Sequence, residues 1–132
     1  MNNYIIYMHT NKINGKIYIG QTCQTLDKRA GSNGTSYKGC YRFYDAIQEY
    51  GWNNFEHTVL LSGLSSDEAN EYEMELIAST RSYDPDIGYN IAPGGYGMTS
   101  ERSKALWANP EYREKISEAN KKIWADEEYH KQ

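Results

Sequence analysis

The sequence predicts a small domain of the α/β (α+β) class, in which a three-stranded antiparallel sheet is flanked by helices and followed by a helical tail. Three observations support this class. Two runs rich in Ile and Tyr flank a turn dipeptide near the N-terminus, a third β-type run follows later, and segments with helical periodicity lie between and after the runs. A chain of 132 residues fits one compact domain, expected over 1–97, with an appendage. The order of the strands is not specified by these patterns.

The segments 4–7 and 16–20 are predicted to form a β-hairpin. Asn14-Gly15, which lies between them, is the dipeptide that most readily forms a tight turn. Because side chains alternate along a strand, Lys16 and Tyr18 share one face of the second run, whereas its isoleucines face a core. The hairpin therefore places a phenol beside an ammonium group.

Three elements are expected after the hairpin. Thr25 caps a short helix that carries Arg29 and ends at Gly31. The Gly- and Ser-rich run 31–39 is a loop by composition. Apolar residues then recur at helical spacing over 43–50, which predicts a helix with one face in the core.

A third strand and a longer helix complete the compact domain. The run 55–61 alternates and then becomes apolar, as a strand entering a core would. Ser65 followed by Glu68 is a capping box that begins a helix over about 66–80. The turn-rich segment 84–95 is expected to close the domain.

One acid of the longer helix faces the core. Glu73 shares the apolar face with Ala69, Leu76 and Ile77, whereas the other glutamates lie on the opposite side. A buried carboxylate is costly unless a cation, a metal or a raised pKa compensates it. Glu73 is therefore either a site residue or the partner of a structural ion pair with an N-terminal basic residue.

The tail contains an internal repeat. The segment 100–113 matches 117–130 at a shift of 17 residues. Each copy is too short to bury a core by itself, so 98–132 is predicted to be a separate helical module. A linker or an oligomer contact is the alternative, because the seven basic and seven acidic residues of 99–132 do not form a basic patch.

The net charge of -4 argues against a nucleic-acid partner, but the charges are segregated. Residues 46–98 carry one basic and nine acidic side chains, whereas residues 1–45 carry two acidic side chains and six basic ones. A polyanion can therefore dock on the first segment while the second faces away. The basic residues of the first segment are Lys12, Lys16, Lys28, Arg29, Lys38 and Arg42.

The remaining composition argues against several other classes. Cys23 and Cys40 lack the spacing of a zinc site or a disulfide framework, which fits a reducing compartment. No signal-like or long apolar run is present, so a cytoplasmic protein without a membrane partner is expected. The histidines His9, His57 and His130 show no metal-ligand spacing, and each is expected to have a surface or packing role. No pattern specifies the oligomeric state.

The hairpin resembles the motif of the GIY-YIG nucleases. Ile5-Ile6-Tyr7 matches the first half and Tyr18-Ile19-Gly20 the second, at the usual separation, although Ile5 replaces the first glycine of the motif. The family also carries an arginine on the first helix, a glutamate on a later helix and an asparagine near the end. The residues here are Arg29, Glu73 and Asn90, so the resemblance covers about residues 4–95.

The resemblance implies a role for each matched residue. Tyr7 is expected to be the general base that takes a proton from the attacking water, while Lys16 and Arg29 lower its pKa. Glu73 is expected to bind one Mg²⁺ (or Mn²⁺), whose preference for oxygen ligands suits a carboxylate. Hydrogen bonds that complete the site are expected from Tyr18 and Asn90.

One departure concerns proton transfer. Many members of the family have a histidine or tyrosine one helical turn after the arginine, and Asn33 occupies that position here. Tyr37 or Lys38, in the same loop, is expected to substitute. Together with Lys28 and Arg42, these two residues are also the predicted nucleic-acid contacts.

The predicted function is a metal-dependent DNA endonuclease of a phage or mobile-element (homing) type, located in the host cytoplasm if phage-encoded. The tail resembles nuclease-associated modular repeats, which implies that it binds DNA. One alternative is an inactive DNA-binding or regulatory module on the same fold, and the retained Tyr7, Arg29 and Glu73 speak against it. Another is a scaffold that acts through the tail alone, and the balanced charge of the tail speaks against strong autonomous DNA binding.

Overall fold

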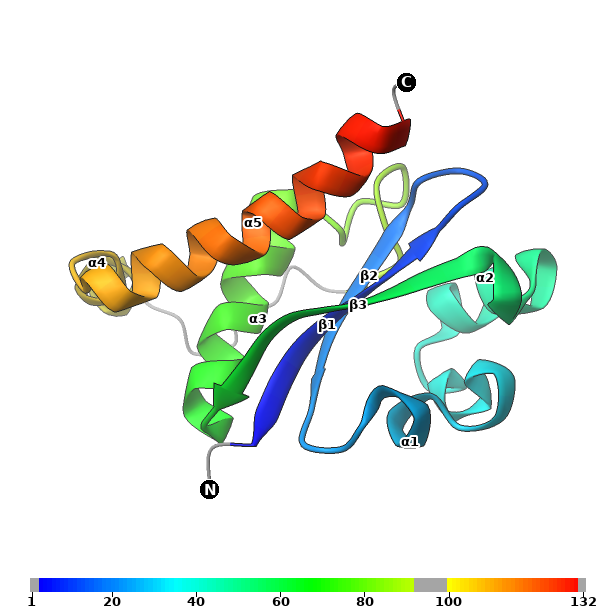
Figure 1. Cartoon of the computed structure of the whole chain (residues 1–132), viewed down its shortest axis with the longest axis horizontal. Coiled ribbons are helices and arrows are strands. Elements are labelled where there is room, and N and C mark those ends of the chain that lie inside the picture. Colours follow the sequence, from blue (N-terminus) through cyan, green and yellow to red (C-terminus); the bar gives the residue numbers. More distant parts are fainter. Residues whose placement is uncertain (1–2, 92–99, 131–132) are drawn as a thin grey trace.

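The computed structural model describes residues 3–91 and 100–130, and Figure 1 shows their arrangement. One antiparallel sheet has the strand order β2-β1-β3, which confirms the predicted fold class and adds the order. No helix in these described ranges is long and apolar enough to cross a lipid bilayer. The elements are β1 (Tyr4–Asn11), β2 (Ile17–Thr22), α1 (Leu26–Ala30), η1 (Ser32–Tyr37), α2 (Tyr41–Tyr50), η2 (Trp52–Asn54), β3 (Phe55–Leu64), α3 (Ser66–Thr80), α4 (Ser100–Trp107) and α5 (Pro110–His130), where η marks a 3-10 helix.

Strand β1 lies in the centre of the sheet, and its side chains alternate between two cores. Ile6 and Met8 belong to an apolar core on one face, whereas Tyr7 belongs to an aromatic core on the other. Strand β2 follows the predicted alternation, since its isoleucines join the apolar core and Tyr18 joins the aromatic core. Helices must therefore cover both faces of the sheet.

Residues 12–16 form the turn between β1 and β2, so the first strand is longer than the predicted run 4–7 and the second begins at Ile17, one residue after the predicted start. Strand β1 continues to Asn11, whose N–H donates to the carbonyl of Lys16 at 2.9 Å. The side chain of Asn14 accepts a hydrogen bond from the Lys16 N–H, and Gly15 has a φ of 77°. The turn needs this left-handed conformation, and glycine adopts it without steric cost.

The aromatic core lies under the first helices. Helix α1 begins as predicted, with the Lys28 N–H donating to the Thr25 hydroxyl. Helix α2 ends as predicted at Gly51, which has a φ of 88°. The residues of the aromatic core are Tyr7, Tyr18, Ala30, Tyr37, Phe43, Ala46, Ile47, Phe55 and Tyr89.

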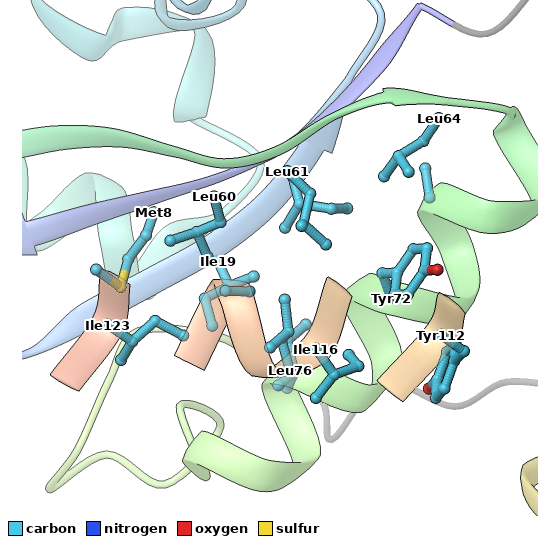
Figure 2. Packing of buried hydrophobic residues seen from close by; sticks show 14 of the residues in the cluster. Met8, Ile19, Leu60, Leu61, Leu64, Tyr72, Leu76, Tyr112, Ile116 and Ile123 are labelled. Atoms are coloured by element: carbon cyan, nitrogen blue, oxygen red, sulfur yellow. The ribbon is translucent and has the colours of Figure 1, made fainter. Parts of the chain in front are cut away.

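The apolar core lies between the other face of the sheet and helices α3 and α5. The predicted capping box of Ser65 and Glu68 is present at the start of α3. Helix α5 contributes an apolar stripe at spacings of four, three and four residues, and Figure 2 shows this stripe facing the sheet. The stripe consists of Tyr112, Ile116, Ala119 and Ile123.

The tail is helical as predicted, but it packs on the sheet. The expected boundary near residue 97 lies outside the described residues, and Leu106 and the stripe of α5 join the core that the sheet and α3 form. Lys122 adds two hydrogen bonds from its Nζ, to the carbonyls of Val59 at 3.3 Å and Leu60 at 3.1 Å. The helical tail therefore buries its apolar face against the same domain.

The two copies of the sequence repeat do not form the same structure. In the first copy, Asn109 ends the link after α4 and accepts a hydrogen bond from the Glu111 N–H, while Pro110 begins α5. The second copy has no proline at the matching position, and α5 continues to His130. The repeat keeps the burial of Leu106 and Ile123, which are related by the 17-residue shift.

Replacing Ile116 by alanine tests this packing. The side chain is 3% exposed in the apolar core, so the variant should lose about 2–4 kcal/mol of unfolding free energy. Urea unfolding measures the loss, with Ser117→Ala as the control, because Ser117 is exposed on the same helix and should change stability by less than about 0.5 kcal/mol. Equal stability of the two variants would show that α5 does not share the core.

Candidate active site

The phenol of Tyr7 lies across Gly20 on the neighbouring strand. The two residues face each other in the β1/β2 register, and Tyr7 is 1% exposed. A Cβ atom on Gly20 would lie 2.5 Å from Cζ of Tyr7, so a larger residue would displace the ring. Gly20, which ends the second half of the motif, therefore leaves the room that the ring of Tyr7, the last residue of the first half, occupies.

Tyr18 borders this position from β2. Its ring stacks on Phe43 at 4.5 Å between centroids, and its hydroxyl lies 3.2 Å from Sγ of Cys40. Burial raises the pKa of Tyr18, so the phenol stays neutral at physiological pH. Tyr18 can therefore donate a hydrogen bond but cannot supply a negative charge.

Arg29 is the cation that acts on Tyr7. The short helix α1 carries it, and its Cζ lies 4.4 Å from the centre of the Tyr37 ring, a cation–π contact that orients the guanidinium. Its charge lowers the pKa of Tyr7. Lys16, the other cation predicted for this role, lies beside Asn11 at the turn end of the hairpin, just before β2 and four residues before Gly20.

Glu73 reaches the site from α3, on the opposite face of the sheet. Its carboxylate is half-buried and accepts a hydrogen bond from Gln21 of β2, whose side chain also donates to Asn70. Burial raises the pKa of Glu73, and the bond from Gln21 lowers it in part. Within the part of the chain that the structure describes, Glu73 forms no ion pair, which disfavours the structural alternative for this acid.

These groups together set the protonation of Tyr7. Burial raises its pKa, and the hydrogen bond from Tyr37 and the charge of Arg29 lower it in part. Cys40 and the carboxylate of Glu73 raise it again. Tyr7 is therefore a phenol, not a phenolate, at neutral pH, with a cation and an anion close enough to affect it.

Asn90 holds the segment after α3 against the edge of β2. Its Oδ1 accepts hydrogen bonds from the Ile19 N–H at 3.0 Å and the Ser82 hydroxyl at 2.7 Å, and its Nδ2 donates to the Ile19 carbonyl at 2.9 Å. The Ile17 N–H donates to the carbonyl of Ile87, and the Tyr89 N–H donates to the carbonyl of Ile17, which continues this contact. The side-chain amide of Asn90, which is predicted to complete the site, is thus hydrogen-bonded to β2, the strand that carries Tyr18 and Gly20.

The predicted nucleic-acid contacts fall into two groups. Lys28 and Lys38 are exposed beside the site, on α1 and after η1, and are available to a polyanion. Arg42 donates to the carbonyls of Tyr83 and Asn90 at 3.0 and 3.1 Å, so it braces the closing segment. Tyr37 corrects the expectation of a loop residue that faces nucleic acid, because its ring is 0% exposed and its hydroxyl points into the aromatic core.

The donor set around Glu73 fits one kind of metal ion. No group of three or more His, Cys, Asp or Glu side chains that could hold a metal occurs among the described residues. A single half-buried carboxylate is too few ligands for a zinc site, but it suits Mg²⁺, which keeps several waters and also binds substrate phosphate. Such an ion would also compensate the burial of the Glu73 charge.

Three residues near the site are absent from the predicted set of site residues. His9 lies two positions after Tyr7 and therefore points to the same face of the sheet. The alternation of side chains along the predicted strand could have indicated this. His57 faces His9 across β1 and β3, and only the strand order reveals this pairing. Gln21 contacts Glu73 because α3 packs beside β2, which no sequence pattern indicates.

Comparisons with known proteins agree with this arrangement. Residues 3–90 match the family model described as the GIY-YIG catalytic domain. Two curated relatives, segE and segD of Enterobacteria phage T4, each carry the name "Putative endonuclease" and are 38% identical over 98 residues and 39% identical over 94 residues. Each match covers 71% of this chain but only 43% and 40% of the relatives, so the chain spans less than half of their length.

A solved structure has a similar fold. The catalytic domain of the intron endonuclease I-TevI superposes with a TM-score of 0.57, and the match covers 71% of this chain and 98% of that chain. The sequence identity is 24%, so the likeness is one of fold. It supports the three-stranded sheet and the helices around it.

Replacing Gly20 by alanine tests the packing of Tyr7. The new methyl group should displace the ring, lower stability by about 1–3 kcal/mol and reduce any activity that depends on the phenol. Gly39→Ala is the control, because a Cβ there meets nothing within 4 Å. A Gly20→Ala variant as stable and active as Gly39→Ala would contradict this account of the motif.

His9 should make stability depend on pH. Its pKa is 6.5 in an ordinary environment, and burial, together with His57 and Arg29, lowers it to about 3 in the folded chain. The unfolded chain binds more protons between these values, so stability falls as the pH decreases through this range. Between pH 7 and 5 the wild type should lose about 2 kcal/mol more than His9→Gln in urea unfolding. Equal losses would show that His9 is not held neutral.

Proposed function

Because this chain belongs to the GIY-YIG family, we propose that it is a metal-dependent DNA endonuclease of a phage or mobile-element type. One observation carries the proposal. A guanidinium from α1 and a carboxylate from α3 both act on the buried phenol of β1, although the three groups are far apart in the sequence. A module that only binds DNA has no need of a half-buried carboxylate beside the position of a phosphate.

Hydrolysis of a phosphodiester requires a base, stabilisation of negative charge and help for the leaving oxygen. In its phenolate form, which the charge of Arg29 favours, Tyr7 accepts a proton from water as the water oxygen bonds to phosphorus and the bond to the leaving oxygen breaks. Arg29 donates to the non-bridging oxygens, for which its forked geometry is suited. Tyr18, held neutral by burial, donates a hydrogen bond from the border of the site.

Glu73 would hold the metal ion. A bound Mg²⁺ or Mn²⁺ would supply positive charge that stabilises the phosphate and the leaving oxygen in the transition state. The hydrogen bond from Gln21 orients the carboxylate, and α3 holds it beside β2. The single carboxylate leaves most of the coordination sphere to water and substrate.

DNA would approach over α1 and η1. Lys28 and Lys38 are exposed there and would release counterions from the phosphates of the duplex. One active site hydrolyses one strand, so a double-strand break would require two sites or two sequential nicks.

The tail would extend the DNA-binding surface. Trp107 is 38% exposed at a hollow that Arg113 and Lys121 also line. An exposed indole beside two cations suits stacking on a base and contact with phosphates. This face of the tail supports the resemblance to modular DNA-binding repeats.

The test compares nicking of supercoiled plasmid by the wild type and Glu73→Gln, with and without Mg²⁺. The substitution removes the charge and keeps the shape, so nicking should fall by about 100-fold or more while affinity in a gel shift changes little. Glu75→Gln is the matched control, since this half-buried acid of α3 faces Tyr112 of α5, and the variant should nick like the wild type. A wild type that binds plasmid but leaves it intact at every Mg²⁺ and Mn²⁺ concentration would instead favour the inactive DNA-binding module.

A further inference from the structure

The turn between β1 and β2 carries an exposed apolar side chain between two lysines. Ile13 is 61% exposed, the highest value among the large hydrophobic side chains of the described residues. Lys12 precedes it and is exposed as well, and the half-buried Lys16 ends the turn. Figure 1 shows the turn projecting from the sheet at the end opposite to the N-terminus. We call residues 12–16 the hairpin tip.

The side chain of Asn11, which is 0% exposed, holds the hairpin tip in one conformation. Its Oδ1 accepts a hydrogen bond from the Ile13 N–H at 2.9 Å, and its carbonyl accepts one from the Gly15 N–H at 2.8 Å. Its Nδ2 donates to the hydroxyl of Tyr89 at 3.1 Å, and the Nδ2 of Asn14 donates to the same hydroxyl at 3.2 Å. These bonds tie the tip to the closing segment of the domain.

Backbone bonds also fix the two lysines on either side of Ile13. The Lys12 N–H donates to the carbonyl of Asn54 at 2.9 Å. The Lys16 N–H donates to Oδ1 of Asn14, and the Lys16 carbonyl accepts from the N–H of β1's last residue, both at 2.9 Å. The backbone of the tip is therefore already ordered, so a binding partner does not bear the entropic cost of ordering it.

The charge of the hairpin tip favours a polyanion as its partner. Residues 12–16 contain two lysines and no acid. Neither lysine forms an ion pair within the ranges that the structure describes. Cations neutralise the phosphates of a nucleic acid, and an apolar group contacts its bases. An exposed isoleucine between two lysines therefore suits a groove of DNA.

The tip lies on one side of the candidate active site, and α1 lies on the other. Strand β2 begins directly after the tip, and α1, which carries the exposed Lys28, follows its end. Lys16 lies four residues before Gly20, which faces Tyr7, and four residues span about 13 Å along a strand. Successive phosphates of one DNA strand rise by about 3.4 Å. A duplex that lies along β2 with the scissile phosphate at Tyr7 therefore meets the tip about four base pairs away.

We propose that the hairpin tip is a further DNA-contact site, which enters the major groove about four base pairs from the cleaved bond and recognises the sequence there through Ile13. The inference rests on the proposed function, because it takes DNA as the substrate. The major groove admits a two-stranded β-ribbon, and the methyl group of thymine is the apolar feature that it presents. Lys12 and Lys16 bind phosphates beside the groove, and Ile13 packs against the thymine methyl group.

The first test measures the salt dependence of binding to a labelled DNA duplex without Mg²⁺, so that it does not depend on cutting. Lys12→Gln and Lys16→Gln should each lower the slope of log K against log salt by about 0.9, because each removes one phosphate contact. Lys115→Gln is the matched control and should keep the wild-type slope. The Lys115 ammonium lies over the ring of Tyr72 and beside Glu111, on helices and not on the tip.

The second test uses Ile13→Ser, which removes the apolar group and keeps the turn, since the turn bond of Ile13 comes from its backbone. Mapping of nicks in a plasmid library should show that the wild type prefers a T·A pair about four base pairs from the nick, and that Ile13→Ser loses this preference by about 5-fold or more. Ile13→Val should keep it. Uracil in place of that thymine removes only the methyl group and should reduce cutting by the wild type but not by Ile13→Ser.

The two tests separate this inference from the proposed function. Wild-type salt slopes in both lysine variants, or a wild-type sequence profile in Ile13→Ser, would overturn the tip as a DNA site and leave it to a protein partner. Nicking that needs Glu73 would in that case still support the proposed function. A wild type that binds no DNA would overturn both.

Discussion

The position of β1 between two cores is the constraint on which the rest of the structure depends. Its odd and even residues leave the strand on opposite faces, so Ile6 and Met8 hold α3 and α5 while Tyr7 and His9 enter the aromatic core. A shift of one residue in register would exchange these sets and bury a phenol and an imidazole among aliphatic side chains. The same pairing places Tyr7 over Gly20, so packing and the geometry of the site have one origin.

The site lies on the central strand β1 and the edge strand β2, and groups from both faces of the sheet contribute to it. The phenol and the guanidinium come from the face covered by α1, and the carboxylate comes from the face covered by α3. This arrangement places the positive charge of Arg29 and the negative charge of Glu73 close to Tyr7. Among the described residues Glu73 forms no ion pair, so its carboxylate can bind a cation. Burial favours the neutral phenol, and the activity of Tyr7 as a base depends on its phenolate fraction, which the charge of Arg29 increases.

In the tail, the two copies of the sequence repeat form different helical structures. Both copies place an aliphatic residue in the apolar core, but a proline after Asn109 begins a new helix in the first copy, whereas the second copy continues α5. The buried stripe of α5 fixes the helix on β3, whereas Arg113 and Lys121 of α5 line a hollow together with Trp107 of α4. The tail has a balanced net charge, yet one of its faces packs on the domain and another faces solvent.

Local sequence determined the elements, because a turn dipeptide, a capping box, strand alternation and glycine helix ends are interactions between residues close in the chain. It also determined that Glu73 faces inward, since helical periodicity alone fixes that face. Strand order, the docking of α5 and the link between His9 and His57 depended on contacts between residues far apart in the chain. The burial of Tyr37 and the bonds of Asn90 and Arg42 to the closing segment are of the same kind. Composition marks such residues as polar or aromatic, but only the folded chain decides which partner satisfies them, because a buried polar group takes whichever donor or acceptor the packing brings within reach.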